Sequence, residues 1–431
     1  MKKCILLAAA AIVALSSCSK SDIDDNMSSQ GVMEFTATIE GTPETRTVYD
    51  ISSSYAKWVA GDQIFIKGYK TDKSGIYTAN ATGATTTFTG PEIKDENTYR
   101  AYYPATMYDD GIVKLPAYYD YEKGRFNMPM YAASSTTQLQ FQNLTAVLAL
   151  TIKSSEVATV QSIKVTSAES KISGPCSLSL SGTDYKYHVT MTGTSDDDNV
   201  VILNCGDPAV TTIADGTVFY IPLPEGSHKL DITVTDGNGV TYEMAGKNAH
   251  TFVRSSFYTL TFKSATGTAK ANINGTMKDV QWVRLWPEGP KFAVMNYGAN
   301  TVTDHGDYNT WDSLCNGQPW GSNWRTPTKD EMEALSAAAS STDTKLSCTY
   351  ITYPGTTDVY GYLYESKLSD YTDVSLFLPV QVGDKYNAFY WSSSTERYYM
   401  DLYKGPNCGK WYTPGNEDYD PIYAHVRPVV N

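Results

Sequence analysis

Histidine is scarce in this sequence: the 431 residues include only five, too scattered to suggest a metal cluster. Basic residues are also in deficit, with 34 Lys and Arg against 47 Asp and Glu and a formal charge of -13. Because phosphate binding relies on clustered Lys and Arg, this imbalance argues against a nucleic-acid partner. The sequence also lacks the motifs of serine hydrolases, zinc proteases and phosphate-binding loops. We therefore expect no enzyme activity, no metal and no cofactor.

Cysteine is present in a pattern that fits neither a zinc site nor a dense disulfide framework. Two of the seven cysteines, Cys4 and Cys18, lie near the amino terminus. The other five are odd in number and widely spaced: Cys176, Cys205, Cys315, Cys348 and Cys408. Their pairing stays open, since spacing alone does not fix the geometry that a disulfide needs.

The sequence is rich in residues that suit half-buried strands. It contains 33 tyrosines, and its short apolar runs are broken by Gly, Asp, Asn or Pro. Aromatic and β-branched residues favour strands, and these breakers favour turns, so we predict a mostly β protein. The clearest alternation begins the folded part and gives one apolar face: Met33, Phe35, Ala37 and Ile39.

The amino terminus indicates export. Residues 1–17 combine two lysines with an apolar stretch too short to span a bilayer, as in a secretory signal. Residues 15–18, Leu-Ser-Ser-Cys, look like a lipobox, so we expect Cys18 to carry the lipid, including palmitate, and to anchor the chain. Ordinary secretion with an incidental cysteine is the alternative. Residues 18–32 are acidic and predict a flexible tether, similar to those of surface-exposed outer-membrane lipoproteins.

Strand and turn signals predict two successive β-sandwich domains, at residues 33–155 and 156–265. Ser264 to Gly275 are small and polar, and we interpret them as a linker. Seven of the eight tryptophans follow this segment. Thr328 and Glu331 there form the sequence pattern of a capping box, which starts a short helix. We expect an α+β domain of a different class at residues 272–431.

Residues 33–263 resemble the fimbrillin family, the subunits of type V pili. The segments that carry the resemblance are Glu34–Ile39, Thr45–Thr47, Trp58–Ile64, Tyr102–Pro104, Phe141–Leu144 and Ser256–Phe262. The resemblance implies two transthyretin-like β-sandwiches, export as a lipoprotein and polymerisation by strand exchange. It also implies cleavage after an arginine just past the first strand, a position that Arg46 and Thr47 match.

Strand exchange also follows from physical reasoning. Removing the first strand from a sandwich leaves an apolar groove with unpaired edge amides, which is a template for another chain's strand. Met33, Phe35, Ala37 and Ile39 would cover that groove before cleavage. The alternative is that Arg46 is an ordinary solvated loop residue and that the protein stays anchored.

Residues 272–431 resemble the C-type-lectin-like modules of pilus-tip and other bacterial surface proteins. The carrying segments are Trp320–Thr328, Leu376–Val380, Tyr390–Thr395 and Val426–Val429. We expect Trp324 and Trp391 in the core, and Arg325 and Arg427 in framework contacts. The candidate rings for stacking on a glycan or protein receptor are Tyr308, Trp311, Tyr398, Tyr399, Trp411 and Tyr412. Two acidic stretches, Asp196–Asn199 and Glu417–Asp420, lack EF-hand spacing and predict solvated loops.

Together these features predict a pilus tip or accessory subunit that acts in adhesion. A whole domain stands where stem subunits of the family carry a donor strand, so we expect this chain to accept a strand and not to donate one. Its partners would be a neighbouring pilin and an unknown receptor. The alternative from another class is a permanently anchored lipoprotein that captures glycans.

Overall fold

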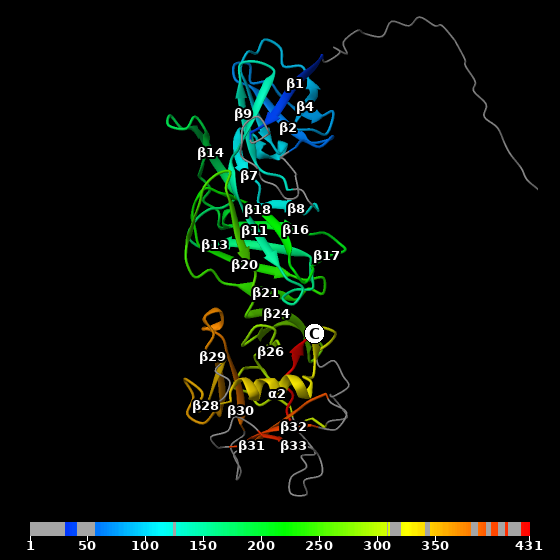
Figure 1. Cartoon of the computed structure of the whole chain (residues 1–431), viewed down its shortest axis with the longest axis vertical. Helices are drawn as coiled ribbons and strands as arrows, with labels where there is room; N and C mark the ends of the chain where they lie inside the picture. The colour runs from blue at the N-terminus through cyan, green and yellow to red at the C-terminus, as the bar shows by residue number, and fades with distance from the viewer. Residues whose placement is uncertain are drawn as a thin grey trace, which may run out of the picture.

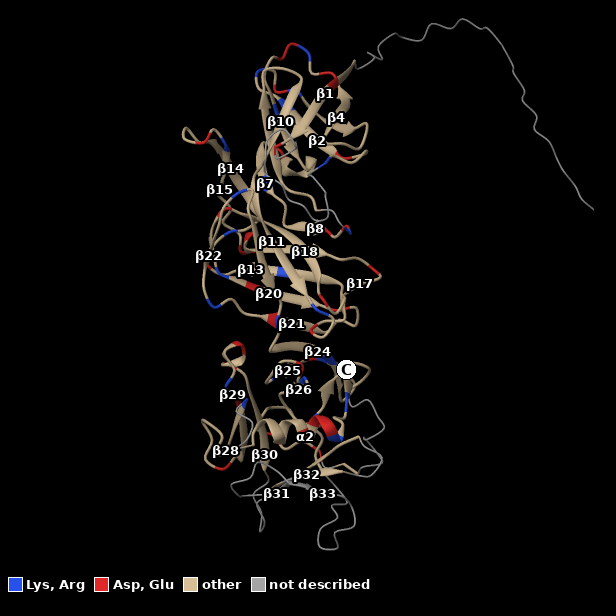
Figure 2. Cartoon of the chain, viewed as in Figure 1, with Lys and Arg blue, Asp and Glu red and all other residues tan. Residues whose placement is uncertain are grey.

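The computed structural model is an elongated, mostly β protein, as the sequence predicted (Figure 1). Strand β1 lies near one end, and the strands after β24 lie at the opposite end. Acidic and basic residues are interspersed along the length of the chain (Figure 2). The structure describes residues 31–40, 57–123, 126–307, 309–310, 320–340, 345–380, 387–393, 398–403, 410–412 and 424–431.

The strands at the amino-terminal end close into a barrel. Their order around the barrel is β1-β10-β9-β5-β2-β3-β4. The bounds are β1 Val32–Ile39, β2 Gln63–Gly68, β3 Ser74–Ala79, β4 Thr85–Pro91, β5 Tyr99–Tyr103, β9 Met130–Ser134 and β10 Gln138–Asn143. The sequence predicted a β-sandwich here. The ring closes instead because β1 pairs in parallel with β10 and antiparallel with β4.

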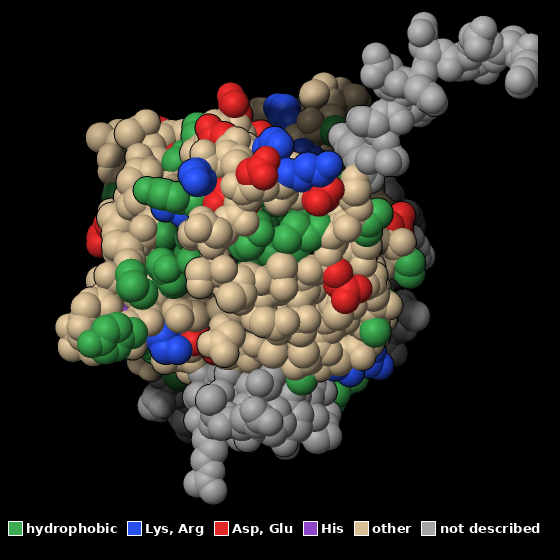
Figure 3. Space-filling model, turned by 90° about the horizontal axis from the view of Figure 1, so that it is seen from above, with side chains coloured by type: hydrophobic (Ala, Val, Ile, Leu, Met, Phe, Trp, Pro, Cys, Tyr) green, Lys and Arg blue, Asp and Glu red, His purple; other side chains and the backbone are tan. Residues whose placement is uncertain are grey.

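The barrel interior is filled by aromatic and aliphatic side chains. Trp58 contacts the rings of Phe88, Tyr103 and Phe141 edge to face, with centroids 4.9–5.2 Å apart. Such geometry adds to the hydrophobic stabilisation of a core. Seen along the long axis, the outer surface of this end carries hydrophobic side chains among acidic and basic ones (Figure 3).

A second core lies between a three-stranded sheet and a ten-stranded sheet. The smaller sheet has the order β18-β11-β23, with bounds Thr217–Pro224, Thr145–Ile152 and Phe257–Thr261. Strand β11 therefore pairs with strands far along the chain, and this core begins before the predicted division near residue 155. The larger sheet includes β8 Tyr118–Asp120, β13 Ser162–Ser167, β16 Val200–Asn204, β20 Leu230–Thr235 and β21 Thr241–Met244.

A four-stranded sheet, with the order β15-β14-β7-β6, combines strands from both parts of the chain. Strands β6 and β7 come from the first part of the chain and β14 and β15 from the second. Their bounds are β6 Tyr108–Asp109, β7 Ile112–Leu115, β14 Gly174–Leu180 and β15 Tyr187–Met191. Short elements complete this half: β12 Thr159–Val160, β17 Val210–Thr211, β19 Gly226–His228, β22 His250–Phe252, and the 3-10 turns η1 Ala105–Met107 and η2 Asp196–Asn199.

The segment predicted to be a linker is a strand. Strand β24 (Thr266–Ile273) pairs along its length with β25 (Thr276–Val283) and joins the ten-stranded sheet. Its residues are small because they pack closely. A Cβ on Gly267 would lie 1.9 Å from the Thr241 carbonyl oxygen and 2.5 Å from the Trp282 ring. The linker prediction was wrong, since small residues signal tight packing as well as flexibility.

The carboxyl-terminal region extends the same sheet. Strands β26 (Phe292–Ala293), β27 (Trp324–Arg325) and β34 (Val429–Val430) continue it beyond β25. The other elements are α2 Lys329–Ala338, β28 Leu346–Thr352, β29 Tyr360–Ser366, η3 Ser369–Tyr371, β30 Ser375–Val380, β31 Asn387–Trp391, β32 Tyr399–Tyr403 and β33 Lys410–Tyr412. The predicted capping box is present at α2: the Thr328 hydroxyl accepts from Glu331 N, and the Glu331 carboxylate accepts from Thr328 N.

A buried ion pair ties this region to the second core. Arg284 donates to the Glu156 carboxylate over 2.8 Å, and their side chains are 3% and 10% exposed. Lys263 pairs with Asp370 at the same junction. The carboxyl-terminal region is therefore attached to the second core by the ten-stranded sheet that they share and by these two ion pairs.

Candidate functional site

Strand β1 is held along both of its edges. Its residues 32–38 pair with β4, and its residues 36–39 pair with β10. Thr36 N donates to Thr137 O over 2.9 Å, and Glu40 N donates to Phe141 O over 2.8 Å. The strand therefore closes a gap between two strands that are far apart in the sequence.

The inner face of β1 forms part of the barrel core. Phe35 and Ala37 are fully buried, Ile39 is 4% exposed, and Met33 is half-buried against the same cluster. The Phe35 ring contacts Tyr77 and Tyr99 edge to face, with centroids 5.1 Å and 4.9 Å away. Removing β1 would thus open an apolar slot lined by aromatic rings.

Trp58 lies in the barrel core beneath β1 and is hydrogen-bonded to it. Its indole Nε1 donates to the Ala37 carbonyl oxygen over 3.2 Å, in addition to the ladder bonds of β1. The Trp58 side chain is 1% exposed. A strand that replaced β1 would have to present a carbonyl at this point, because an unpaired buried donor is costly.

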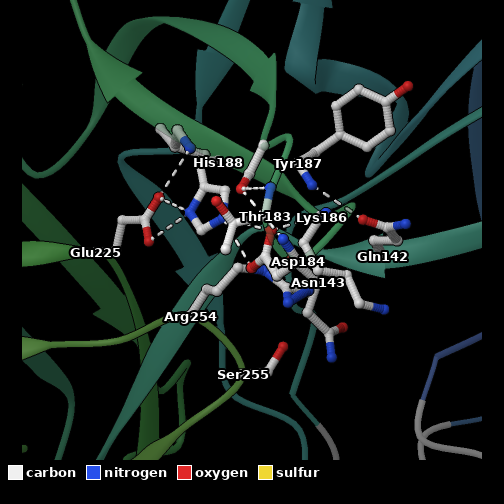
Figure 4. A network of polar contacts seen from close by, with 12 residues as sticks. Gln142, Asn143, Thr183, Asp184, Lys186, Tyr187, His188, Glu225, Arg254 and Ser255 are labelled. Carbon is white, nitrogen blue, oxygen red and sulfur yellow. Dashed lines mark hydrogen bonds and ion pairs between the residues drawn. The ribbon is translucent and has the colours of Figure 1, made fainter.

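Glu40, directly after β1, belongs to a polar network with Asn143, Lys186, Arg254 and Ser255, which Figure 4 labels. The Glu40 carboxylate accepts from Asn143 N (2.6 Å), Lys186 Nζ (2.9 Å) and Ser255 Oγ (3.1 Å), and it pairs with the Arg254 guanidinium. Arg254 Nε also donates to Asn143 O over 3.0 Å. Glu40 therefore joins β1 to the hairpin of β14 and β15 and to the turn before β23.

His188 lies beside this network on β15. Its Nδ1 contacts Glu225 at 2.9 Å and its Nε2 contacts Asp184 at 3.1 Å. The hydrogen bond with Glu225 raises the pKa of His188, partial burial opposes this, and the Asp184 hydrogen bond adds to the rise. Protonated His188 thus satisfies two carboxylates at once.

Sequence reasoning did not identify Glu40, Lys186 or Arg254 as functional residues. Glu40 and Arg254 are 214 positions apart, so no local pattern links them. The one signal was the alternation of β1, which puts Ile39 inside and leaves the next side chain to face its neighbours.

The residues predicted for lipidation and processing, Cys18, Arg46 and Thr47, lie outside the described residues. Tyr308 and Trp311 do so as well. The backbones of Trp411 and Tyr412 are in β33, which pairs with β32.

The two remaining candidate rings are neighbours at the start of β32 and differ in burial. Tyr398 is half-buried, with Lys329 Nζ 3.8 Å from its ring centroid. Tyr399 is 2% exposed and packs edge to face on Phe389 and Trp391. The proposed ligand contact by Tyr399 is therefore wrong, because a buried ring offers no face to a ligand.

The framework predictions for this region are confirmed. Trp324 and Trp391 are 0% and 1% exposed. Arg325 pairs with Glu331 at the start of α2. Arg427 is fully buried and donates to the carbonyls of Ala293 and Phe377 over 3.2 Å and 2.7 Å.

The described residues were compared with the requirements of a metal site, a reactive thiol and a membrane-spanning helix, and they meet none of them. No group of three or more His, Cys, Asp or Glu side chains in them is arranged to hold a metal ion. In the acidic turn η2, Asp198 accepts from Ser195 N and so caps the turn. Burial raises the pKa of Cys176 to about 11 and that of Cys205 to about 12, so both stay protonated and weakly nucleophilic. No helix in the described part is long and apolar enough to cross a membrane.

Comparisons with known proteins gave structural similarities only. No protein-family model and no curated protein matches the sequence. A candidate cell adhesion protein of Bacteroides ovatus is 16% identical, with 57% of this chain and 94% of that chain covered and a TM-score of 0.32. A second, from Bacteroides thetaiotaomicron, is 10% identical over 54% and 93%, with a TM-score of 0.24.

The tip fimbrial protein Mfa3 of Porphyromonas gingivalis, in a C-terminally truncated form, is 11% identical over 54% of this chain and 95% of that chain. Its TM-score is 0.22. We attach no functional conclusion to these similarities.

Proposed function

We propose that this chain is a tip or accessory subunit of a surface pilus that acts in cell adhesion and has no enzyme activity. A neighbouring subunit would insert a strand in place of β1. The observation that carries the proposal is the position of β1, which pairs along both edges and supplies a face of the barrel core.

The slot left by β1 has what an inserted strand requires. The edges of β4 and β10 would present unpaired backbone groups, and such edges template strand addition. The vacated positions of Phe35 and Ile39 would give apolar pockets on alternate residues. Backbone pairing would supply affinity, and these pockets would supply specificity.

Processing would produce the acceptor. Cys18 would first anchor the chain in the outer membrane as a surface lipoprotein, and cleavage between Arg46 and Thr47 would then free residues 18–46, lipid and β1 together. Cys348 is disulfide-bonded, which suits an oxidising location such as the cell surface. The mature subunit would belong to the fimbrium.

The carboxyl-terminal region would face the receptor. It lies at the end of the molecule opposite β1, so it would leave the slot accessible (Figure 1). Val429 and Val430 are buried within the ten-stranded sheet, so this segment is not available as a donor strand. We propose that this region is lectin-like and recognises a glycan or protein. Tyr398 and the rings at positions 308, 311, 411 and 412 remain the candidate contacts.

The Arg46→Ala variant tests the proposal. We expect export to continue, the precursor to accumulate and incorporation into pili to cease. Immunogold labelling of wild-type cells should place the protein at pilus tips. If the variant is incorporated as well as the wild type, or if the wild-type protein never occurs on pili, the proposal fails and an anchored glycan-capture role becomes the better account.

A further inference from the structure

Glu40 directly follows β1 and contacts the second core. Its carboxylate accepts from Lys186, beside β15 of the four-stranded sheet, and from Ser255, and it pairs with Arg254; Arg254 and Ser255 lie just before β23 of the second core. The carboxylate also accepts a hydrogen bond from Asn143 N, where the chain passes from β10 to β11. We describe this site as a carboxylate receptor, since its donors come from separate parts of the fold and converge on one carboxylate.

The receptor is largely shielded from solvent. The Arg254 side chain is 10% exposed, and that of Glu40 is 18% exposed. The neighbouring carboxylates Asp184 and Glu225 are engaged with His188. In the ion pairs among the described residues, Arg254 and Lys186 meet no carboxylate other than Glu40.

Loss of β1 would remove Glu40 with it, because Glu40 precedes Arg46 in the chain. Arg254 would then be a mostly buried cation without its counter-charge, which is strongly unfavourable. A strand that filled only the apolar pockets would leave this charge uncompensated. A strand with a carboxylate at the matching position would restore a charge-assisted hydrogen bond.

We propose that the slot selects its occupant by charge. This inference rests on the proposed function. The inserted strand would carry an apolar side chain at the position of Ile39 and an acidic residue at the position of Glu40, bound by Arg254, Lys186, Ser255 and Asn143. The partner is thus an extended segment with alternating apolar residues that ends on an acidic side chain.

A strand-exchange assay on the full chain tests this inference. A recognition site for a sequence-specific protease is placed within residues 42–55, the purified protein is cut there, and β1 stays seated without a covalent link. Fluorescent peptides of residues 32–41 are then added in excess, and exchange is followed by anisotropy. The peptides are the native sequence, Glu40→Gln, and Glu34→Gln as the matched control on the exposed face.

We expect the native and Glu34→Gln peptides to bind alike and the Glu40→Gln peptide to bind about 10- to 100-fold more weakly, since a bond to a charged group is lost. In the Arg254→Gln protein this difference should shrink to a few-fold. If the Arg254→Gln protein does not fold, the Lys186→Gln protein takes its place, since the Lys186 side chain is half-exposed. There the difference in affinity between the native and Glu40→Gln peptides should shrink too, but by less.

Each other outcome counts against one of the two proposals. If the native and Glu40→Gln peptides exchange equally, or if their difference persists unchanged in both protein variants, selection by charge is wrong and strand acceptance stands. If no peptide exchanges into the cut protein, strand acceptance itself is wrong, and selection by charge falls with it.

Discussion

The indole Nε1 of Trp58 donates to the carbonyl oxygen of Ala37 over 3.2 Å, inside the barrel. This bond joins β1 to Trp58 in the barrel core, and it is separate from the backbone hydrogen bonds that pair β1 with β4 and β10. Trp58 also contacts three aromatic rings, so the same side chain organises the core and fixes β1.

The Trp58→Phe variant should therefore loosen β1. It keeps an aromatic ring in the core but leaves the buried Ala37 carbonyl with one partner fewer. We expect a loss of about 1–3 kcal/mol in the free energy of unfolding, measured by urea denaturation. Faster hydrogen exchange at the amides of β1 than at those of β13 should accompany it. Unchanged stability would show that this bond contributes nothing.

Phe35→Ala should destabilise the barrel more strongly. The Phe35 side chain is fully buried between Tyr77 and Tyr99, and its removal leaves a cavity. We expect a loss of about 3–5 kcal/mol in the free energy of unfolding. Glu34→Ala, on the exposed face of the same strand, is the control and should change stability by less than about 0.5 kcal/mol. Equal effects of the two substitutions would contradict an interior position for β1.

Glu156→Ala should weaken the junction between the second core and the carboxyl-terminal region. It leaves Arg284, 3% exposed, without its counter-charge. We expect a loss of about 3–5 kcal/mol, recorded by calorimetry. Glu169→Ala, at an exposed position, is the matched control. If Glu156→Ala behaves like this control, the ion pair does not stabilise the junction.

His188 should make stability depend on pH. Its pKa in the folded protein is raised above the ordinary value of about 6.5 by its carboxylate partners. A raised pKa means that the protonated form is stabilised, so the contribution is complete below the unfolded pKa and is lost as pH rises through the folded pKa. The stability of the wild type relative to His188→Gln should be greater at about pH 5.5 than at about pH 9. A difference that does not vary with pH would contradict this.

The sequence alone was sufficient for the features that depend on local patterns. The alternation of Phe35, Ala37 and Ile39 predicts an inward face, and the structure has these side chains inside. The capping box of Thr328 and Glu331 predicts where α2 begins, because both of its bonds join residues three positions apart.

Features that depend on long-range packing could not be predicted. The run of small residues in β24 has the composition of a linker, and only the approach of Trp282 and Thr241 explains it. Tyr398 and Tyr399 look alike in the sequence, yet Tyr398 precedes β32 and is half-buried, whereas Tyr399 begins β32 and is buried against Phe389 and Trp391. The Glu40 network depends on three distant segments that meet only after folding.

A reversible covalent lock on β1 tests the central claim most directly. Thr36 of β1 and Thr87 of β4 are paired across the ladder and both are half-buried, so Thr36→Cys with Thr87→Cys should form a disulfide. The control is Thr78→Cys with Thr89→Cys, which joins two strands that stay in the barrel.

Incorporation into pili is then measured on cells, with and without a reducing agent. We predict that the locked β1 variant reaches the surface but is not incorporated until it is reduced, whereas the control is incorporated in both conditions. Incorporation of the oxidised β1 variant at the level of the control would contradict the claim that another subunit's strand takes the place of β1.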